Sequence, residues 1–127
     1  MAHQDDRGGR RRSRWPRRTR AALRASATAD RFAPLWADLR AAAEDAVSAG
    51  PPPLRFREFA AFRERGDRLG YERPYFARRR QLAALALTVL VDDRPDQATA
   101  LNDLVWAVCD EHTWALPAHL PPEGSPT

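Results

Sequence analysis

Prolines and glycines divide this chain into segments of helix length, and that division most constrains its fold. Gly50 and the prolines at 51–53 separate two apolar-periodic segments, and Pro95 and Pro117 interrupt the chain again. Proline suits the first turn of a helix but breaks its interior. Between these breaks, apolar residues recur with the i, i+3, i+4 spacing of one helix face. The sequence therefore predicts an all-α fold of amphipathic helix hairpins.

Four helices are predicted. Asp30 is the expected N-cap of a first helix that ends at Ala49, and the second covers residues 55–65. The third runs from Arg73 or Pro74 to about residue 91, and the fourth from Pro95 to about residues 109–111. In the first, second and fourth of these helices, the residues expected to face the core are Phe32, Leu35, Trp36, Leu39, Ala43, Val47, Phe56, Phe59, Ala60, Leu101, Leu104, Val105 and Val108. The apolar surface of the third is expected from Phe76, Leu82, Ala83, Ala86, Leu87 and Leu90. The C-terminal half of the third helix is apolar on nearly every side, which predicts burial on more than one face.

Charge separates a basic N-terminal segment from a mildly acidic body. Residues 1–24 hold nine arginines and two acids, whereas residues 25–127 hold twelve arginines and fifteen acids. The lack of apolar periodicity predicts a disordered Arg-rich tail over residues 1–28. The helical domain is expected over residues 29–120, and a loop or truncated end over 121–127. Arginines around Trp15 are compatible with nucleic-acid binding, but no recognised nucleic-acid motif follows them. A solvated leader is therefore the favoured interpretation, and nucleic acid is not the expected partner.

The sequence indicates neither a membrane segment nor a metal site. The longest apolar run, residues 82–91, is too short to span a bilayer, and no apolar segment follows the N-terminal arginines as a secretory signal requires. A cytoplasmic location is therefore expected. The single cysteine, Cys109, excludes an internal disulfide and is expected to be a small buried residue. Cys109, His112 and His119 lack the spacing of a compact zinc site, so neither a metal nor a cofactor is expected.

A cluster of candidate site residues follows the fourth helix. A helix dipole disfavours an acid at its C-terminal end, which favours a role for Glu111 in binding sugar hydroxyls or in orienting His119 over that of a surface acid. Trp114 suits stacking on a sugar ring or core packing, and His119 suits acid/base work or a bond to a loop carbonyl. Tyr75 and Arg79 are further candidates for contact with an anionic polysaccharide. Only one or two arginines of the run 78–80 can share a helix face, and the others are expected to be solvated or paired with acids.

Three segments carry a resemblance to a known family. They are residues 54–68, residues 71–82 with the run Arg78-Arg79-Arg80, and residues 106–119, which combine an acid, a tryptophan and Pro117-Ala118-His119. Over roughly residues 35–120, the chain resembles the N-terminal helices of heparinase II/III-like polysaccharide lyases. The resemblance implies the start of an incomplete α/α toroid and β-elimination on uronic-acid-containing polysaccharides.

The resemblance also implies which parts of such an enzyme this chain holds. Substrate-binding roles are expected for Glu111, Trp114, His119, Tyr75 and Arg79, with His119 as the one catalytic candidate. The chain stops soon after Pro-Ala-His, so it is predicted to be a truncated fragment without lyase activity of its own. Apolar faces of Phe56, Phe59, Phe76 and residues 82–90 are expected to be exposed for a missing downstream domain or for self-association. The alternative is a small helical binding module, with the Arg-rich tail on nucleic acid or the apolar face on a partner chain.

Overall fold

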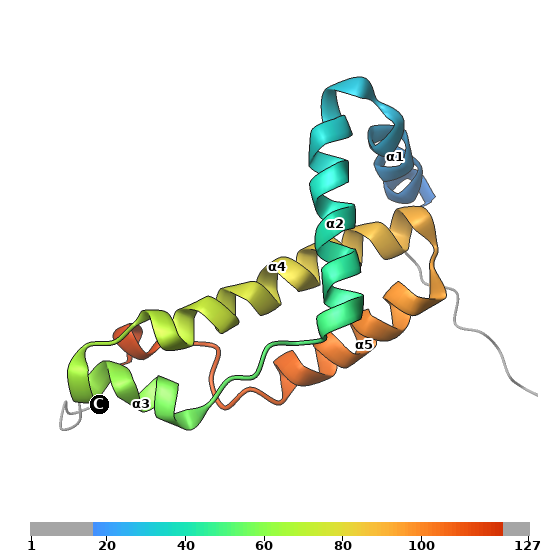
Figure 1. Ribbon diagram of the computed structural model, residues 1–127. Helices are drawn as coiled ribbons and strands as arrows, with labels where there is room; N and C mark the ends of the chain where they lie inside the picture. The colour runs from blue at the N-terminus through green and yellow to red at the C-terminus, as the bar shows by residue number, and fades with distance from the viewer. Residues whose placement is uncertain (1–16, 121–127) are drawn as a thin grey trace, which may run out of the picture.

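The computed structural model describes residues 17–120, and within that range every regular element is helical. The elements are α1 (Arg17–Thr28), the 3-10 turn η1 (Asp30–Phe32), α2 (Ala33–Ala49), α3 (Phe56–Arg65), α4 (Leu69–Asp92), α5 (Pro95–Cys109) and the 3-10 turn η2 (Pro117–His119). Figure 1 shows α4 and α5 as an antiparallel hairpin crossed by α2. The helix α1 lies beside α2 near one end of this hairpin, and α3 and η2 lie at the other. The all-α prediction is confirmed for the described part of the chain.

Local sequence signals set most of the helix boundaries. Pro95 lies in the first turn of α5, where its missing N–H costs no helical hydrogen bond. Gly50 and Gly66 end α2 and α3 with φ angles of 69° and 72°, which a residue without a Cβ adopts easily. The helix α4 begins at Leu69, earlier than predicted. Near its start, the Gly70 N–H donates to Asp67 Oδ1 (3.3 Å), so one of the first N–H groups of the helix has a hydrogen-bond partner.

The predicted disorder of residues 1–28 is wrong for residues 17–28, which form α1. Arg20 Nε donates to the Leu90 carbonyl (2.9 Å), and its guanidinium pairs with Asp93 (3.4 Å). Trp36 Nε1 donates to Ser26 Oγ (3.1 Å), which joins α1 to α2. Contacts with distant parts of the chain thus order a helix that lacks a wide apolar stripe. Residues 1–16 of the predicted tail, and the predicted loop over 121–127, lie outside the described residues.

The core lies where α2 crosses α4 and α5. Its buried members are Ala43, Ala46, Ala84, Leu85 and Leu104, and Leu39, Ala42, Val47, Leu82, Ala100, Leu101 and Val108 pack against them. The C-terminal half of α4 contacts α1, α2 and α5, so the prediction that this half is buried on more than one face is confirmed. The expected exposure of residues 82–90 is correspondingly wrong, since Leu85 and Thr88 are fully buried.

Three apolar residues predicted to face the core are instead exposed. Leu35, Val105 and Phe56 are 54%, 44% and 82% exposed. Periodicity identifies the apolar side of a helix but not how much of that side its neighbours cover. In α3 the fully buried alanine is Ala61 rather than the predicted Ala60.

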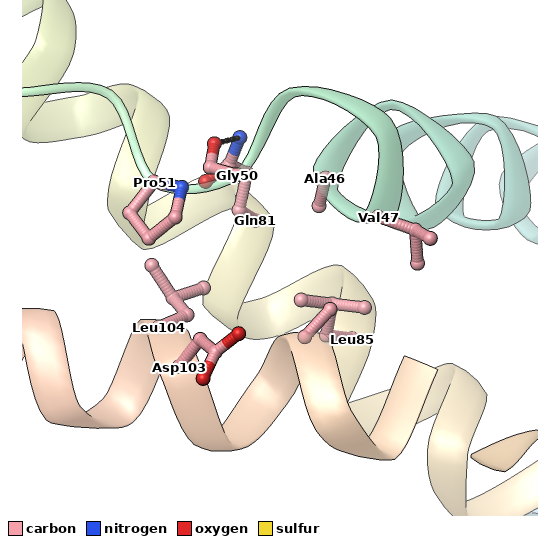
Figure 2. A pocket seen from close by; sticks show the side chains of 9 residues that line it. Ala46, Val47, Gly50, Pro51, Gln81, Leu85, Asp103 and Leu104 are labelled. Carbon is pink, nitrogen blue, oxygen red and sulfur yellow. Dashed lines mark hydrogen bonds between the residues drawn. The ribbon is translucent and has the colours of Figure 1, made fainter. Parts of the chain in front are cut away.

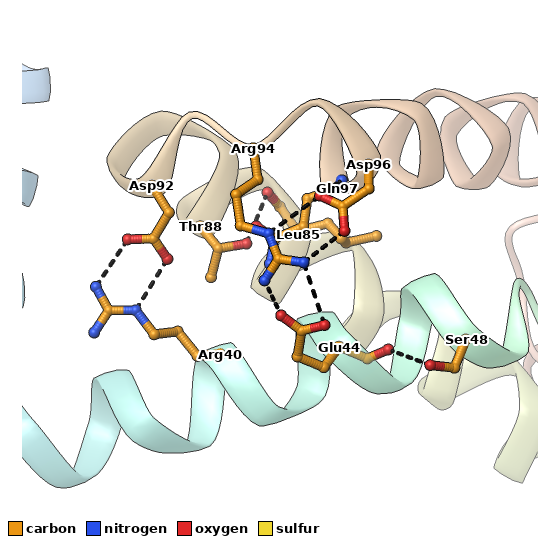
Figure 3. Close-up of polar contacts among 9 residues, drawn as sticks. All are labelled: Arg40, Glu44, Ser48, Leu85, Thr88, Asp92, Arg94, Asp96 and Gln97. Carbon is orange, nitrogen blue, oxygen red and sulfur yellow. Dashed lines mark hydrogen bonds and ion pairs between the residues drawn. The ribbon is translucent and has the colours of Figure 1, made fainter.

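Polar contacts fasten α2 to the turn between α4 and α5 (Figure 3). Arg40 donates two hydrogen bonds to Asp92, from Nε (2.9 Å) and Nη2 (2.8 Å). The Arg40 hydrogen bond holds the pKa of Asp92 below its ordinary value. Arg94 pairs with both Glu44 of α2 and Asp96 of α5. These contacts fix the direction in which α2 crosses the hairpin. Across residues 17–120, no helix has both the length and the apolar character needed to cross a membrane.

Candidate functional site

The candidate site is built around Glu111, whose carboxylate is buried between two arginines of α4. The Glu111 side chain is 1% exposed. Arg79 binds it with both nitrogens, Nη1 to Oε1 (2.8 Å) and Nη2 to Oε2 (2.6 Å), and Arg78 Nη1 donates to Oε1 (3.0 Å). A buried carboxylate is stable only when paired and hydrogen-bonded in this way. We call Arg78, Arg79 and Glu111 the clamp.

Within the clamp, Arg78 joins three separate segments of the chain. Besides Glu111, it donates from Nε to the Pro52 carbonyl (2.7 Å) and from Nη1 to the Ala107 carbonyl (3.1 Å). It thereby holds the loop before α3, the end of α5 and the C-terminal segment together. Arg78 is not among the site residues predicted from the sequence. Its position four residues before Leu82 and seven before Leu85, on the apolar side of α4, is the signal that could have found it.

Tyr75 and Trp114 extend the clamp toward the C-terminus. The guanidinium carbon of Arg79 lies 3.6 Å from the centre of the Tyr75 ring. Tyr75 donates its hydroxyl hydrogen to the Trp114 carbonyl (2.6 Å), and Trp114 Nε1 donates to the Val108 carbonyl (2.9 Å). Four of the five predicted site residues are therefore connected. Their polar groups are engaged within the chain, whereas the Trp114 side chain stays largely exposed.

His119 is separate from this network. It lies exposed in η2, which packs against α3. Within residues 17–120, its imidazole makes no hydrogen bond or ion pair with the clamp. The expected contact between Glu111 and His119 is not among the described contacts, and the Glu111 carboxylate accepts from the arginines of α4 instead.

A cleft of about 560 Å³ opens beside the clamp. It is lined by Leu54, Arg55, Phe56, Phe59, Tyr71, Arg78, Trp106, Ala107, Asp110, Glu111, His112 and Thr113. Phe56 from α3 and Trp106 from α5 are 82% and 79% exposed, so their rings are available to a ligand. The Phe59 ring packs edge-on against Tyr71 (centroids 5.3 Å apart) and against His112 (6.5 Å). This volume falls within the range of small-molecule sites.

Two exposed aromatic residues of the cleft, Phe56 and Trp106, are not among the site residues predicted from the sequence. Phe56 was predicted to face the core from α3 but also to belong to an exposed apolar face, and the structure confirms its exposure. Trp106 lies off the stripe of Leu101, Leu104 and Val108, so a large aromatic on the polar side of α5 was the available signal.

Burial and a nearby negative charge keep the tyrosine of the cleft in its neutral form, which can donate a hydrogen bond. Burial, and next the negative charge of Glu111, raise the pKa of Tyr71, although the two clamp arginines oppose the shift. For Arg79, burial disfavours the charged form, but the hydrogen bond and charge of Glu111 raise its pKa overall. The Arg79 guanidinium therefore stays charged, and the Tyr71 phenol stays protonated at neutral pH.

A second cavity, of about 50 Å³, lies at the end of α2 (Figure 2). Gly50, Pro51, Leu85 and Leu104 are among its lining residues, and Gln81 Nε2 donates to the Gly50 carbonyl (3.2 Å) at its edge. This volume suits a water molecule but not a sugar.

The possible metal ligands near the end of α5 are considered next, followed by the comparisons with known proteins. Cys109 is exposed, which corrects the expectation of a buried residue. In the described part of the chain, no group of three or more His, Cys, Asp or Glu side chains is placed to hold a metal ion. Comparison of the chain with protein-family models, curated proteins and solved structures found no match.

Proposed function

We propose that the chain is the N-terminal helical part of a heparinase II/III-like polysaccharide lyase, and that this part binds an acidic polysaccharide without cleaving it. In such an enzyme, these helices would begin the incomplete α/α toroid. The observation that carries the proposal is the cleft beside the clamp, where Phe56 and Trp106 present exposed rings next to Tyr71. Aromatic faces suit the apolar faces of sugar rings, and the Tyr71 hydroxyl is a hydrogen-bond donor for sugar oxygens.

The clamp joins two of the segments that resemble the lyase family, which supports the proposal that they belong to one domain. Arg79 and Glu111 belong to two different segments of the resemblance and lie 32 positions apart in the chain. Their bidentate pairing holds the segment with Trp114 and Pro117 against α3 and α4. The clamp thus acts as a support that fixes one wall of the cleft.

Two groups beside the cleft, Glu111 and Tyr71, are unsuited to act as the base of a lyase reaction. β-Elimination needs a base for the C5 proton, a group that neutralises the substrate carboxylate and an acid for the leaving oxygen. Glu111 is fully engaged by two arginines, and the raised pKa of Tyr71 opposes formation of a phenolate base. We therefore assign Glu111 to holding the wall of the cleft in place and Tyr71 to binding the sugar.

Titration of the full chain with uronic-acid oligosaccharides tests the proposal. We expect Trp106→Ala to weaken binding by about tenfold, which corresponds to losing ~1.4 kcal/mol of aromatic contact. Leu35→Ala is the control, because Leu35 is an exposed apolar residue of α2 outside the cleft. Equal binding by wild type and Trp106→Ala would overturn the assignment of the cleft, and unsaturated uronate produced by the 127-residue chain would overturn its role as a non-cleaving part.

A second candidate function is docking of a partner chain or of a second copy at the same cleft. The exposed Phe56, Val105 and Trp106 side chains favour it, because apolar surfaces of this kind often mark interfaces. Light scattering after size exclusion separates the two functions. A monomer of 14.3 kDa that binds oligosaccharide supports the first, whereas a dimer that Trp106→Ala dissociates supports the second.

A further inference from the structure

The exposed side of α1 carries arginines that have no acidic partner. Arg17 and Arg24 are seven residues apart, so they lie on nearly the same side of the helix, about 10.5 Å apart along its axis. Arg18 lies about 100° around the helix from Arg17. Ala21 and Thr28, which are exposed and small, lie beside this row. A large polyanion can therefore approach the arginines closely.

Three of the four arginines of α1 have no acidic partner, whereas most arginines elsewhere in the described residues pair with an acid. Its segment RRTRAALRASAT contains no acid, and among the described residues no ion pair involves Arg17, Arg18 or Arg24. By contrast, Arg68 of the body pairs with Glu72 (2.9 Å). Arg20, the other arginine of α1, holds the helix in place through Leu90 and Asp93. One arginine thus anchors α1, and three remain available to a ligand.

We propose that the exposed side of α1 binds the phosphate backbone of double-stranded nucleic acid without reading its sequence. Guanidinium groups match phosphate oxygens with two parallel hydrogen bonds, and neutralising phosphates releases condensed counterions. Helix geometry sets the spacing of these charges, and the docking of α1 on α2 and α4 fixes which side of α1 is exposed (Figure 1). The sequence before α1 adds five arginines at positions 7–14 against two acids at 5 and 6, which strengthens the positive field.

The packing of α1 favours nucleic acid over a lipid surface. An interfacial membrane helix needs a free apolar stripe to insert among acyl chains. In α1, the larger apolar residue Leu23 lies half-buried, and the exposed apolar residues are the alanines 21, 22 and 25. The exposed side of α1 therefore offers charge to a ligand but little apolar area.

Two triple variants of the full chain test the proposal by fluorescence anisotropy with a mixed-sequence DNA duplex at about 50 to 200 mM salt. The first combines Arg17→Gln, Arg18→Gln and Arg24→Gln. The matched control combines Arg57→Gln, Arg73→Gln and Arg80→Gln, which removes the same charge from exposed, unpaired arginines of α3 and α4. Glutamine and arginine have similar helix propensities, and circular dichroism checks that both variants keep their helices.

We expect the α1 variant to reduce the slope of log affinity against log salt by roughly 0.9 per lost phosphate contact, or about 2.7 in all, while the control keeps the wild-type slope. Equal losses in the two variants would overturn the proposal, because net charge alone would then explain binding. Absence of wild-type binding, or no loss in the α1 variant, would also overturn it. If a uronic-acid polysaccharide binds more tightly than DNA with the same dependence on α1, the surface belongs to that polymer and the proposal is wrong.

Discussion

We expect Glu111→Gln to lower the free energy of unfolding by about 3 kcal/mol. Three charge-assisted hydrogen bonds end on this carboxylate, at 2.6, 2.8 and 3.0 Å. Each such bond contributes ~1.5–3 kcal/mol, and the glutamine oxygen can keep only part of this set. Arg78 and Arg79 would then lack a counter-charge, with side chains only 10% and 27% exposed. The residual exposure of Arg79 places the cost near the lower end of the ~3–5 kcal/mol found for broken buried pairs.

Urea unfolding followed by circular dichroism measures this loss. A change of about 3 kcal/mol lowers the folding equilibrium constant by roughly 100-fold. The control is Glu64→Gln, since Glu64 is a 66% exposed acid whose partner Arg65 lies 3.8 Å away. Such a surface pair contributes less than about 1 kcal/mol. If Glu111→Gln costs no more than Glu64→Gln, the clamp does not stabilise the fold and the reasoning is refuted.

A double variant separates the charge effect from the loss of hydrogen bonds. Adding Arg79→Gln to Glu111→Gln removes one of the two arginines left without a counter-charge. We therefore expect the double variant to cost less than the sum of the two single changes, by about 1 kcal/mol or more. Strict additivity would show that the two side chains do not interact in solution.

Three further predictions concern the core, the acid stability and the C-terminal segment. Leu104→Ala should destabilise the chain by about 3 kcal/mol, because Leu104 is 1% exposed, whereas Trp106→Ala should stay within roughly 0.5 kcal/mol in the same urea assay. The hydrogen bond from Arg40 lowers the pKa of Asp92 in the folded chain. The stability that this pair contributes is therefore present above the unfolded pKa of 3.8 and is lost as the pH falls through the folded pKa. Asp92→Asn should therefore flatten the acid side of the stability profile, and coincident profiles would refute this. Tyr75→Phe removes the hydrogen bond to the Trp114 carbonyl and should speed amide exchange in residues 113–119, so unchanged exchange there would contradict the proposed anchoring.

The sequence alone predicted the helical class and most helix boundaries. The start of α5 at Pro95 and the ends of α2 and α3 at Gly50 and Gly66 agree with the structure. These features depend on φ restrictions and on hydrogen bonds within a few residues, which the local sequence decides. The order of α1 was not predictable in the same way, because it depends on a contact of Arg20 with Leu90, 70 positions along the chain, and on a contact of Ser26 with Trp36 of the next helix.

The sequence also selected Tyr75, Arg79, Glu111 and Trp114, which the fold connects in one network. Tertiary structure alone decided their partners. Residues more than 30 positions apart meet only because α4 and α5 pack side by side, and this packing directs the Glu111 carboxylate to arginines instead of a histidine. The cleft arises from the same packing, since α3 and α5 bring Phe56 and Trp106 to one opening. Periodicity along one helix carries no information about the distance to the next, and that distance sets burial, charge pairing and the shape of a site.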